Sequence, residues 1–217
     1  FEQPYRRVRD MVRFLRDAFS GEKVSHRYDT FEVSGFRLGV RPEVPPKVLV
    51  AALREQMLVM AGREADGAII NWLAPEDVPT VAGIVNGAAG GEPREIVARI
   101  FVCPSERSDV VREGARRAIA AYMNVPVYAA FQDWLGRGEA LRPMWEAWAA
   151  GDRRGALEVI PDEVVDALVV HGSPEHCRRR IDDYFDAGVT TSSLAILPLD
   201  PELDFFGAVR DLSPRAA

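Results

Sequence analysis

The sequence predicts an α/β fold built around a parallel β-sheet. The chain has 217 residues, which is the size of one ordinary domain. Several short, continuous apolar runs are typical of strands that are buried on both faces, as in a parallel sheet. The first three runs are each followed by a segment whose apolar residues recur every three or four positions, the spacing of an amphipathic helix. Such alternation of strands and helices indicates a parallel α/β architecture.

The chain opens with a predicted helix over residues 4–19, because its apolar residues form one stripe: Val8, Met11, Val12, Leu15 and Phe19. Gly21 stands where a helix-ending glycine is expected. Residues 23–41 alternate between apolar and polar side chains and predict a hairpin excursion, with His26 exposed. Pro42, Pro45 and Pro46 then predict an extended approach to the first strand.

The predicted core alternates strands and helices in chain order. Strands are expected over residues 47–52, 68–71 and 96–103, followed in turn by helices over 54–65, 76–86 and 109–122. Residues 123–165 are less regular and predict a helical excursion of two short helices, with Trp134, Trp145 and Trp148 in its core.

A second regular stretch follows this excursion. Ser173 and Pro174 predict the start of a helix, as its N-cap and first helical residue, and Gly188 predicts its end. The inner face of this helix is predicted to hold Cys177, Ile181, Tyr184 and Phe185. A fourth strand over 192–197 and a last helix over 202–212 complete the chain.

Two parallel architectures compete for this pattern. A doubly wound nucleotide-binding fold would carry a G-x-G-x-x-G turn after its first strand, whereas Gly87, Gly90 and Gly91 precede a strand. A (β/α)8 barrel needs eight strands in about 250 residues, and the pattern here supplies four. The chain also starts on a helix. If the fold is a barrel, the chain corresponds to its second half.

Composition excludes several classes of protein. The chain is 47% hydrophobic and 28% charged, which predicts a folded domain rather than a disordered one. The net charge of −6 argues against a nucleic-acid partner, and no apolar run is long enough to predict a membrane span. No leader is predicted after Phe1. Two distant cysteines suggest neither a disulfide framework nor a metal site, so a cytoplasmic location is expected.

Three stretches carry a family resemblance. They are RVRDMVRFLRDAFSGEKV at residues 7–24, AALREQMLVMAGREADGAIINWLAPED at 51–77 and GSPEHCRRRIDDYFDAGV at 172–189. Their order and spacing resemble the luciferase-like monooxygenase superfamily, in particular the branch that uses the deazaflavin coenzyme F420. The resemblance covers nearly the whole chain and is loosest over residues 123–165.

The resemblance implies a fold and a function. It implies a (β/α)8 TIM barrel of the bacterial luciferase-like type, of which residues 1–217 would be the C-terminal half of a single domain with only strands five to eight. It implies an oxidoreductase that transfers a hydride between reduced F420 and an unidentified small organic substrate, as a homodimer. Two alternatives stay open: an FMN-dependent monooxygenase of the same fold, or a non-catalytic half-barrel that binds or assembles with a partner. Catalytic residues cannot be assigned, because the positions that the family uses lie in the other half of the barrel.

The resemblance also implies where the coenzyme binds. Barrel active sites lie at the C-terminal ends of the strands, where helix N-termini offer free N–H groups to phosphate. The turns that contact the phosphodiester tail in F420-dependent relatives correspond here to Ala52, Leu53 and Arg54, and to Asn71 and Trp72. Relatives often carry glycine at the position of Leu53 or Arg54, so this chain departs from a close backbone cradle. A cation at a helix N-terminus is disfavoured unless an anion binds there, which makes Arg54 a candidate phosphate ligand.

Other polar residues are predicted to be structural. Trp72 is expected to act as a packing or lid residue more than as a stacking platform. His171 and His176 are expected to be surface or capping residues, Cys103 and Cys177 small core residues, and Arg178–Arg180 a solvated face.

Overall fold

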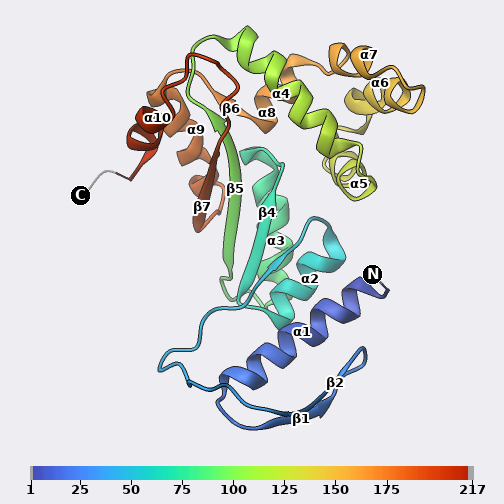
Figure 1. Ribbon diagram of the computed structural model, residues 1–217, viewed down its shortest axis with the longest axis vertical. Helices are drawn as coiled ribbons and strands as arrows, with labels where there is room; N and C mark the ends of the chain where they lie inside the picture. Colours follow the sequence, from blue (N-terminus) through green and yellow to red (C-terminus); the bar gives the residue numbers. More distant parts are fainter. Residues whose placement is uncertain (1, 215–217) are drawn as a thin grey trace. The chain divides into compact units, whose positions relative to one another are not determined.

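The computed structural model describes residues 2–214, and the chain forms two compact units. The first unit comprises the described residues up to Ile69 together with Thr80–Val97, and the second comprises Ile70–Pro79 and the described residues from Ala98 onward. Two strands and one helix of the chain contribute residues to both units (Figure 1).

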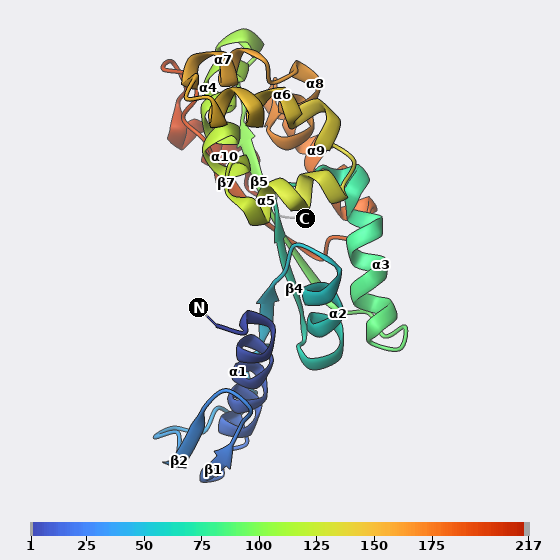
Figure 2. The ribbon, with the colours of Figure 1, turned by 90° about the vertical axis from the view of Figure 1, so that its right-hand side faces the viewer.

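The first unit begins with α1 (Pro4–Phe19) and a two-stranded antiparallel hairpin, β1 (Val24–Arg27) and β2 (Glu32–Phe36), as predicted. Gly21 ends the helix region in the left-handed conformation, with φ of 80°. The hairpin lies along α1 (Figures 1 and 2) and is fixed to it by aromatic edge contacts of Phe14. It is also fixed by the buried carboxylate of Asp10, which accepts hydrogen bonds from the backbone N–H and hydroxyl of Thr30 at 2.9 and 2.8 Å.

A β–α–β unit follows in the first unit. The strand β3 (Leu49–Ala51) is parallel to β4 (Gly67–Asn71), and α2 (Glu55–Glu64) connects them. Gly67 is required at the start of β4, because a Cβ there would lie 2.0 Å from the carbonyl oxygen of Glu95. Arg13 of α1 pairs with Glu64 at the end of α2, which links the first helix to this unit.

The main sheet has five strands in the described residues, not the four that the sequence predicts. Its order is β3-β4-β5-β6, and β7 also pairs with β5; the further strands are β5 (Glu95–Cys103), β6 (Val170–His171) and β7 (Thr191–Ile196). The β3–β4 and β5–β6 pairs are parallel, as expected. Pattern analysis missed β6 because two residues are too few to show a period.

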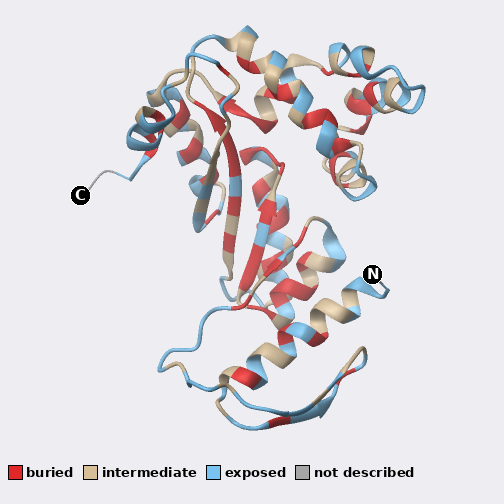
Figure 3. Ribbon diagram, viewed as in Figure 1, coloured by how far each residue is buried: buried red, intermediate tan, exposed pale blue. Residues whose placement is uncertain are grey.

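The expectation that the strands are buried on both faces is wrong for β3, β4 and β7 and for part of β5. Residues alternate along β3, β4 and this part of β5 between buried and exposed (Figure 3), with Val50, Ala68, Ile70 and Ala98 buried. Ala51, Ile69 and Arg99 occupy the alternate positions and are exposed. Successive side chains of a strand point to opposite faces, so one face of this part of the sheet is open. We call it the open face.

The second unit is mostly helical. After β4 come a 3-10 turn, η1 (Pro75–Asp77), and α3 (Val78–Ala88), whose later residues belong to the first unit. After β5 comes α4 (Ser108–Met123). The excursion holds four helices rather than the predicted two: α5 (Pro126–Trp134), α6 (Gly138–Ala149), α7 (Arg153–Glu158) and α8 (Asp162–Leu168). Of the three tryptophans predicted in its core, Trp145 and Trp148 pack against the buried cluster, and Trp134 is half-buried and stacks on Phe131.

The last helices of the second unit are α9 (Pro174–Asp186) and α10 (Phe205–Leu212). Ser173 caps α9 by accepting a hydrogen bond from the backbone N–H of His176, as the sequence predicts. Cys177, Ile181 and Tyr184 are buried, but Phe185 is exposed, so its assignment to the inner face is wrong. Phe185 directly follows Tyr184, and one step around a helix turns a side chain by about 100°.

Candidate functional site

The first group of predicted site residues follows β3 in the first unit. Ala52 is buried and donates its N–H to the carbonyl oxygen of Ile69 at 3.0 Å, which continues the strand pairing for one more residue. Leu53 is half-buried. Arg54 is exposed and is the N-cap of α2, with extended backbone angles.

The start of α2 is open to an anion. An arginine side chain carries no hydrogen-bond acceptor, so it cannot cap the first-turn N–H groups, and within the described chain no side chain caps them. Free N–H groups at a helix N-terminus, together with a guanidinium, form a set of donors that suits phosphate. These residues therefore fit the phosphate end of a nucleotide-like coenzyme.

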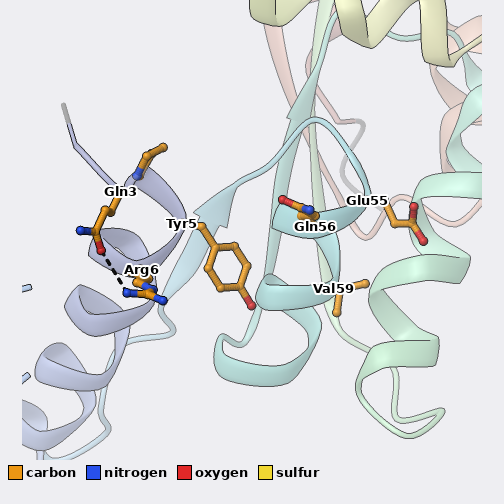
Figure 4. Close-up of a pocket in the computed structure, with 7 residues that line it drawn as sticks. Gln3, Tyr5, Arg6, Glu55, Gln56 and Val59 are labelled. Carbon is orange, nitrogen blue, oxygen red and sulfur yellow. Dashed lines mark hydrogen bonds between the residues drawn. The ribbon is translucent and has the colours of Figure 1, made fainter. Parts of the chain in front are cut away.

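A hollow borders this helix start within the first unit (Figure 4). It has a volume of about 1040 Å³ and lies between the first turns of α1 and α2, where Tyr5 and Arg6 face Gln56 and Val59. Tyr5 extends from α1 toward α2, and Glu55 also lines the hollow. The first turn of α2 is thus accessible from an open cavity.

The second group of predicted site residues lies at the end of β4 in the second unit. Asn71 is the last strand residue, is half-buried, and makes no side-chain hydrogen bond within residues 2–214. Trp72 is buried and stacks on Phe101 with ring centroids 3.9 Å apart. Its indole Nε1 is buried without a hydrogen-bond partner in the described part of the chain. Trp72 is therefore a packing residue.

The turn after β4 is held rigidly in an unusual conformation. Trp72 has φ of 52°, in the left-handed region, which costs a residue other than glycine about 1 kcal/mol or more. The side-chain amide of Gln132 donates to the carbonyl oxygen of Trp72 at 2.6 Å, and the hydroxyl of Tyr184 donates to that of Leu73 at 2.8 Å. Asp77 accepts the N–H of Ala74 and pairs with Arg137. Backbone strain that is held by several bonds is common at functional sites.

A charged residue that the sequence reasoning did not single out lies beside this turn. Arg99 is exposed on the open face, with its guanidinium carbon 4.9 Å from the ring centroid of Phe101. The N–H of Glu95 donates to the carbonyl oxygen of Asp66, so β4 and β5 start together, and Asn71 and Arg99 lie four or five residues further on. The signal for Arg99 was present in the sequence as the one charged residue inside the apolar run IVARIFVC at 96–103.

The expectation for His171 is wrong. Its side chain is 9% exposed, and its Nε2 lies 2.8 Å from a carboxylate oxygen of Asp166. Burial raises the pKa of Asp166, but hydrogen bonds from Arg112 and His171 outweigh it and hold the pKa of that carboxyl below its ordinary value. His176 is exposed, as expected.

The two cysteines are buried, as expected for core residues. Cys103 ends β5, and Cys177 lies in α9. Burial raises the pKa of Cys103, and it raises the pKa of Cys177 to about 12. These thiols are protonated at neutral pH and are poor nucleophiles.

The three basic residues at 178–180 form less of a free solvated face than expected. Arg179 is exposed, but Arg180 pairs with both Glu76 and Asp183. Within residues 2–214, no helix combines the length and apolar character that a membrane crossing requires.

A parallel sheet with connecting helices, and polar residues where its strands end, defines the class of α/β folds in which ligands bind at strand C-termini. The model of the family described as luciferase-like monooxygenase matches residues 1–191. The chain belongs to this family.

Individual relatives are more distant. The chain is 28% identical over 201 residues to a protein named 5,10-methylenetetrahydromethanopterin reductase from Methanolobus tindarius, covering 88% of this chain and 60% of the relative. It is 25% identical over 211 residues to a protein of the same name from Archaeoglobus fulgidus, covering 93% and 63%. The solved structure of the coenzyme F420 dependent tetrahydromethanopterin reductase from Methanopyrus kandleri superposes with a TM-score of 0.77 and 18% identity, over 96% of this chain and 61% of that one. The chain thus spans about three-fifths of the length of the relatives it matches.

Proposed function

We propose that this chain is part of an F420-dependent oxidoreductase that acts on a small organic substrate. The observation that carries the proposal is the uncapped start of α2 with Arg54 at its N-cap, in a chain whose relatives are named as reductases. The name of the solved relative specifies coenzyme F420, which favours that coenzyme over FMN.

The proposed division of labour follows from the residues. Bound reduced F420 would supply a hydride, and the protein would supply position and electrostatics. In the first unit, the guanidinium of Arg54 and the N–H groups at the start of α2 bind the phosphate end, with Ala52 and Leu53 forming the turn. In the second unit, the carboxamide of Asn71 and the backbone of Trp72 remain proposed coenzyme contacts, each to be tested by its own variant.

The extent of the barrel is also part of the proposal. Because the chain spans 60–63% of the two reductases named above, we propose that its sheet corresponds to strands five to eight of a (β/α)8 barrel, with β6 as a short addition. The catalytic residues of the family would then lie in the other half. The proposal also includes a single barrel domain for each subunit, a homodimer, and a cytoplasmic location.

The test is a fluorescence titration of the chain with F420 and, separately, with FMN. We expect F420 to bind and FMN to bind more weakly. Arg54→Ala should weaken F420 binding by about 10- to 100-fold, which is the scale of a charge-assisted hydrogen bond. The unfolding midpoint should stay unchanged, because the side chain of Arg54 is exposed.

The matched control is Arg63→Ala, which removes an exposed arginine from the last turn of the same helix. This control should leave F420 binding unchanged. If Arg54→Ala and Arg63→Ala have equal dissociation constants, the phosphate site is not at the start of α2.

A further inference from the structure

We propose that Arg99 is a specificity-determining residue that binds an anionic oxygen, a carboxylate or phosphate oxygen, of the substrate or coenzyme on the open face of the sheet. This inference rests on the proposed function and deepens it, since it names the chemical class of the group recognised at the site.

The position of Arg99 in β5 is the first argument. Its neighbours Ala98 and Ile100 are buried at 0% and 1%, so the strand presents a covered face and, at Arg99, an uncovered one. Arg99 is exposed, so its charge is accessible to a ligand on the open face.

The support under the guanidinium is the second argument. Arg99 lies over the ring of Phe101, and Phe101 is only 4% exposed because Trp72 stacks on it. A guanidinium that rests on an aromatic face keeps the N–H donors along its edge free for a bidentate anion. The stack therefore orients Arg99 before any ligand binds, and it reduces the conformational entropy lost on binding.

The charge balance is the third argument. Nine other arginines of the second unit pair with carboxylates in the described residues: Arg107, Arg112, Arg116, Arg117, Arg137, Arg154, Arg178, Arg180 and Arg210. Arg99 has no ion pair within the described residues. Asn71, its neighbour on β4, is neutral. A cation beside a neutral amide donor attracts an oxyanion.

The position of Arg99 along the strand direction, relative to the end of β4, is the fourth argument. Arg99 lies four residues before the end of β5, yet it is level with Asn71, the last residue of β4. The neighbouring strand therefore ends beside it. Ligands of parallel α/β proteins bind where strands end, so Arg99 is within the region that such ligands reach.

The experiment compares wild type with Arg99→Gln and Arg99→Lys. F420 binding is measured by fluorescence titration, and inorganic phosphate binding is measured by calorimetry on the same proteins with and without F420. Arg179→Gln is the matched control, because Arg179 is exposed in the second unit and has no ion pair in the described chain. Far-ultraviolet circular dichroism and the urea midpoint establish that each variant folds.

The outcomes separate the sources of the oxyanion. If the coenzyme supplies it, Arg99→Gln weakens F420 binding at least 10-fold, Arg99→Lys weakens it less, and added salt reduces the difference. If the substrate supplies it, F420 binding is unchanged, but phosphate binds to wild type with F420 and at least 10-fold more weakly to Arg99→Gln. Equal binding of both probes to wild type, Arg99→Gln and Arg179→Gln would overturn the inference. Failure of wild type to bind F420 would overturn the proposed function instead, and the phosphate measurements without F420 would still decide the role of Arg99.

Discussion

At the scale of single residues, the buried carboxylate of Asp10 stabilises the first unit through its hydrogen bonds. Burial raises the pKa of Asp10, but hydrogen bonds from Thr30 and Arg9 together lower it by more than burial raises it. The pKa of the folded carboxyl therefore lies below its ordinary value. A carboxyl of this kind stabilises the fold at pH values above its unfolded pKa of about 3.9. That contribution is lost as the pH falls through the lower folded pKa.

Asp10→Asn should therefore destabilise the protein at neutral pH by about 1–3 kcal/mol, since the charged hydrogen bonds to Thr30 and Arg9 are weakened. It should also flatten the loss of stability below pH 4. Urea midpoints measured from pH 7 to pH 2 check both expectations. Asp29→Asn is the control, because Asp29 also pairs with Arg9 but its side chain is 62% exposed. Parallel pH profiles for wild type and Asp10→Asn would contradict the argument.

At the scale of elements, the turn between β4 and α3 depends on helices that are distant in sequence. Tyr184 of α9 donates to Leu73, and Gln132 of α5 donates to Trp72. This turn carries Asn71 at one end and η1 at the other, so α5 and α9 position a candidate site residue through backbone hydrogen bonds.

Tyr184→Phe should lower the free energy of unfolding by about 1–3 kcal/mol, because the carbonyl oxygen of Leu73 would lose its bond in a buried place. The measurement is the urea midpoint at pH 7. Tyr122→Phe is the matched control, since Tyr122 is 37% exposed and its hydroxyl makes no hydrogen bond among residues 2–214. A midpoint for Tyr184→Phe equal to that of Tyr122→Phe would show that this bond does not hold the turn.

Elements with strong local signals were predictable, and those fixed by tertiary contacts were not. The stripe of α1 and the cap at Ser173 are local, and both are confirmed. β6 exists through its pairing of Val102 with Val170, which no local pattern shows. The burial of His171 depends in the same way on a partner, Asp166 in α8. Arg99 was overlooked because apolar runs were interpreted as buried on both faces, a rule that fails where a sheet has an open face.

At the scale of the whole molecule, the sheet formed by the described residues has a free edge and an open face. β3 is the terminal strand in the sheet order, and Ile69 on the open face is 38% exposed. Unpaired strand edges and exposed apolar residues favour association.

We therefore expect the chain to self-associate. Light scattering over a range of concentrations should give at least twice the mass of one chain, and the apparent mass should fall on dilution if the contact is weak. Ile69→Lys should reduce the association, and Arg179→Gln should not. A monomer at every concentration would contradict this expectation.

The two buried thiols allow the opening of the second unit to be measured by the rate of thiol labelling. Cys103 and Cys177 are each 0% exposed, and both lie in the second unit. A thiol reagent can reach them only during transient opening, because a protonated and buried sulfur does not react. When reclosing is faster than modification, the labelling rate divided by that of an unfolded thiol gives the equilibrium fraction of open molecules. The native chain therefore reports the opening of its second unit under non-denaturing conditions, with no engineered label.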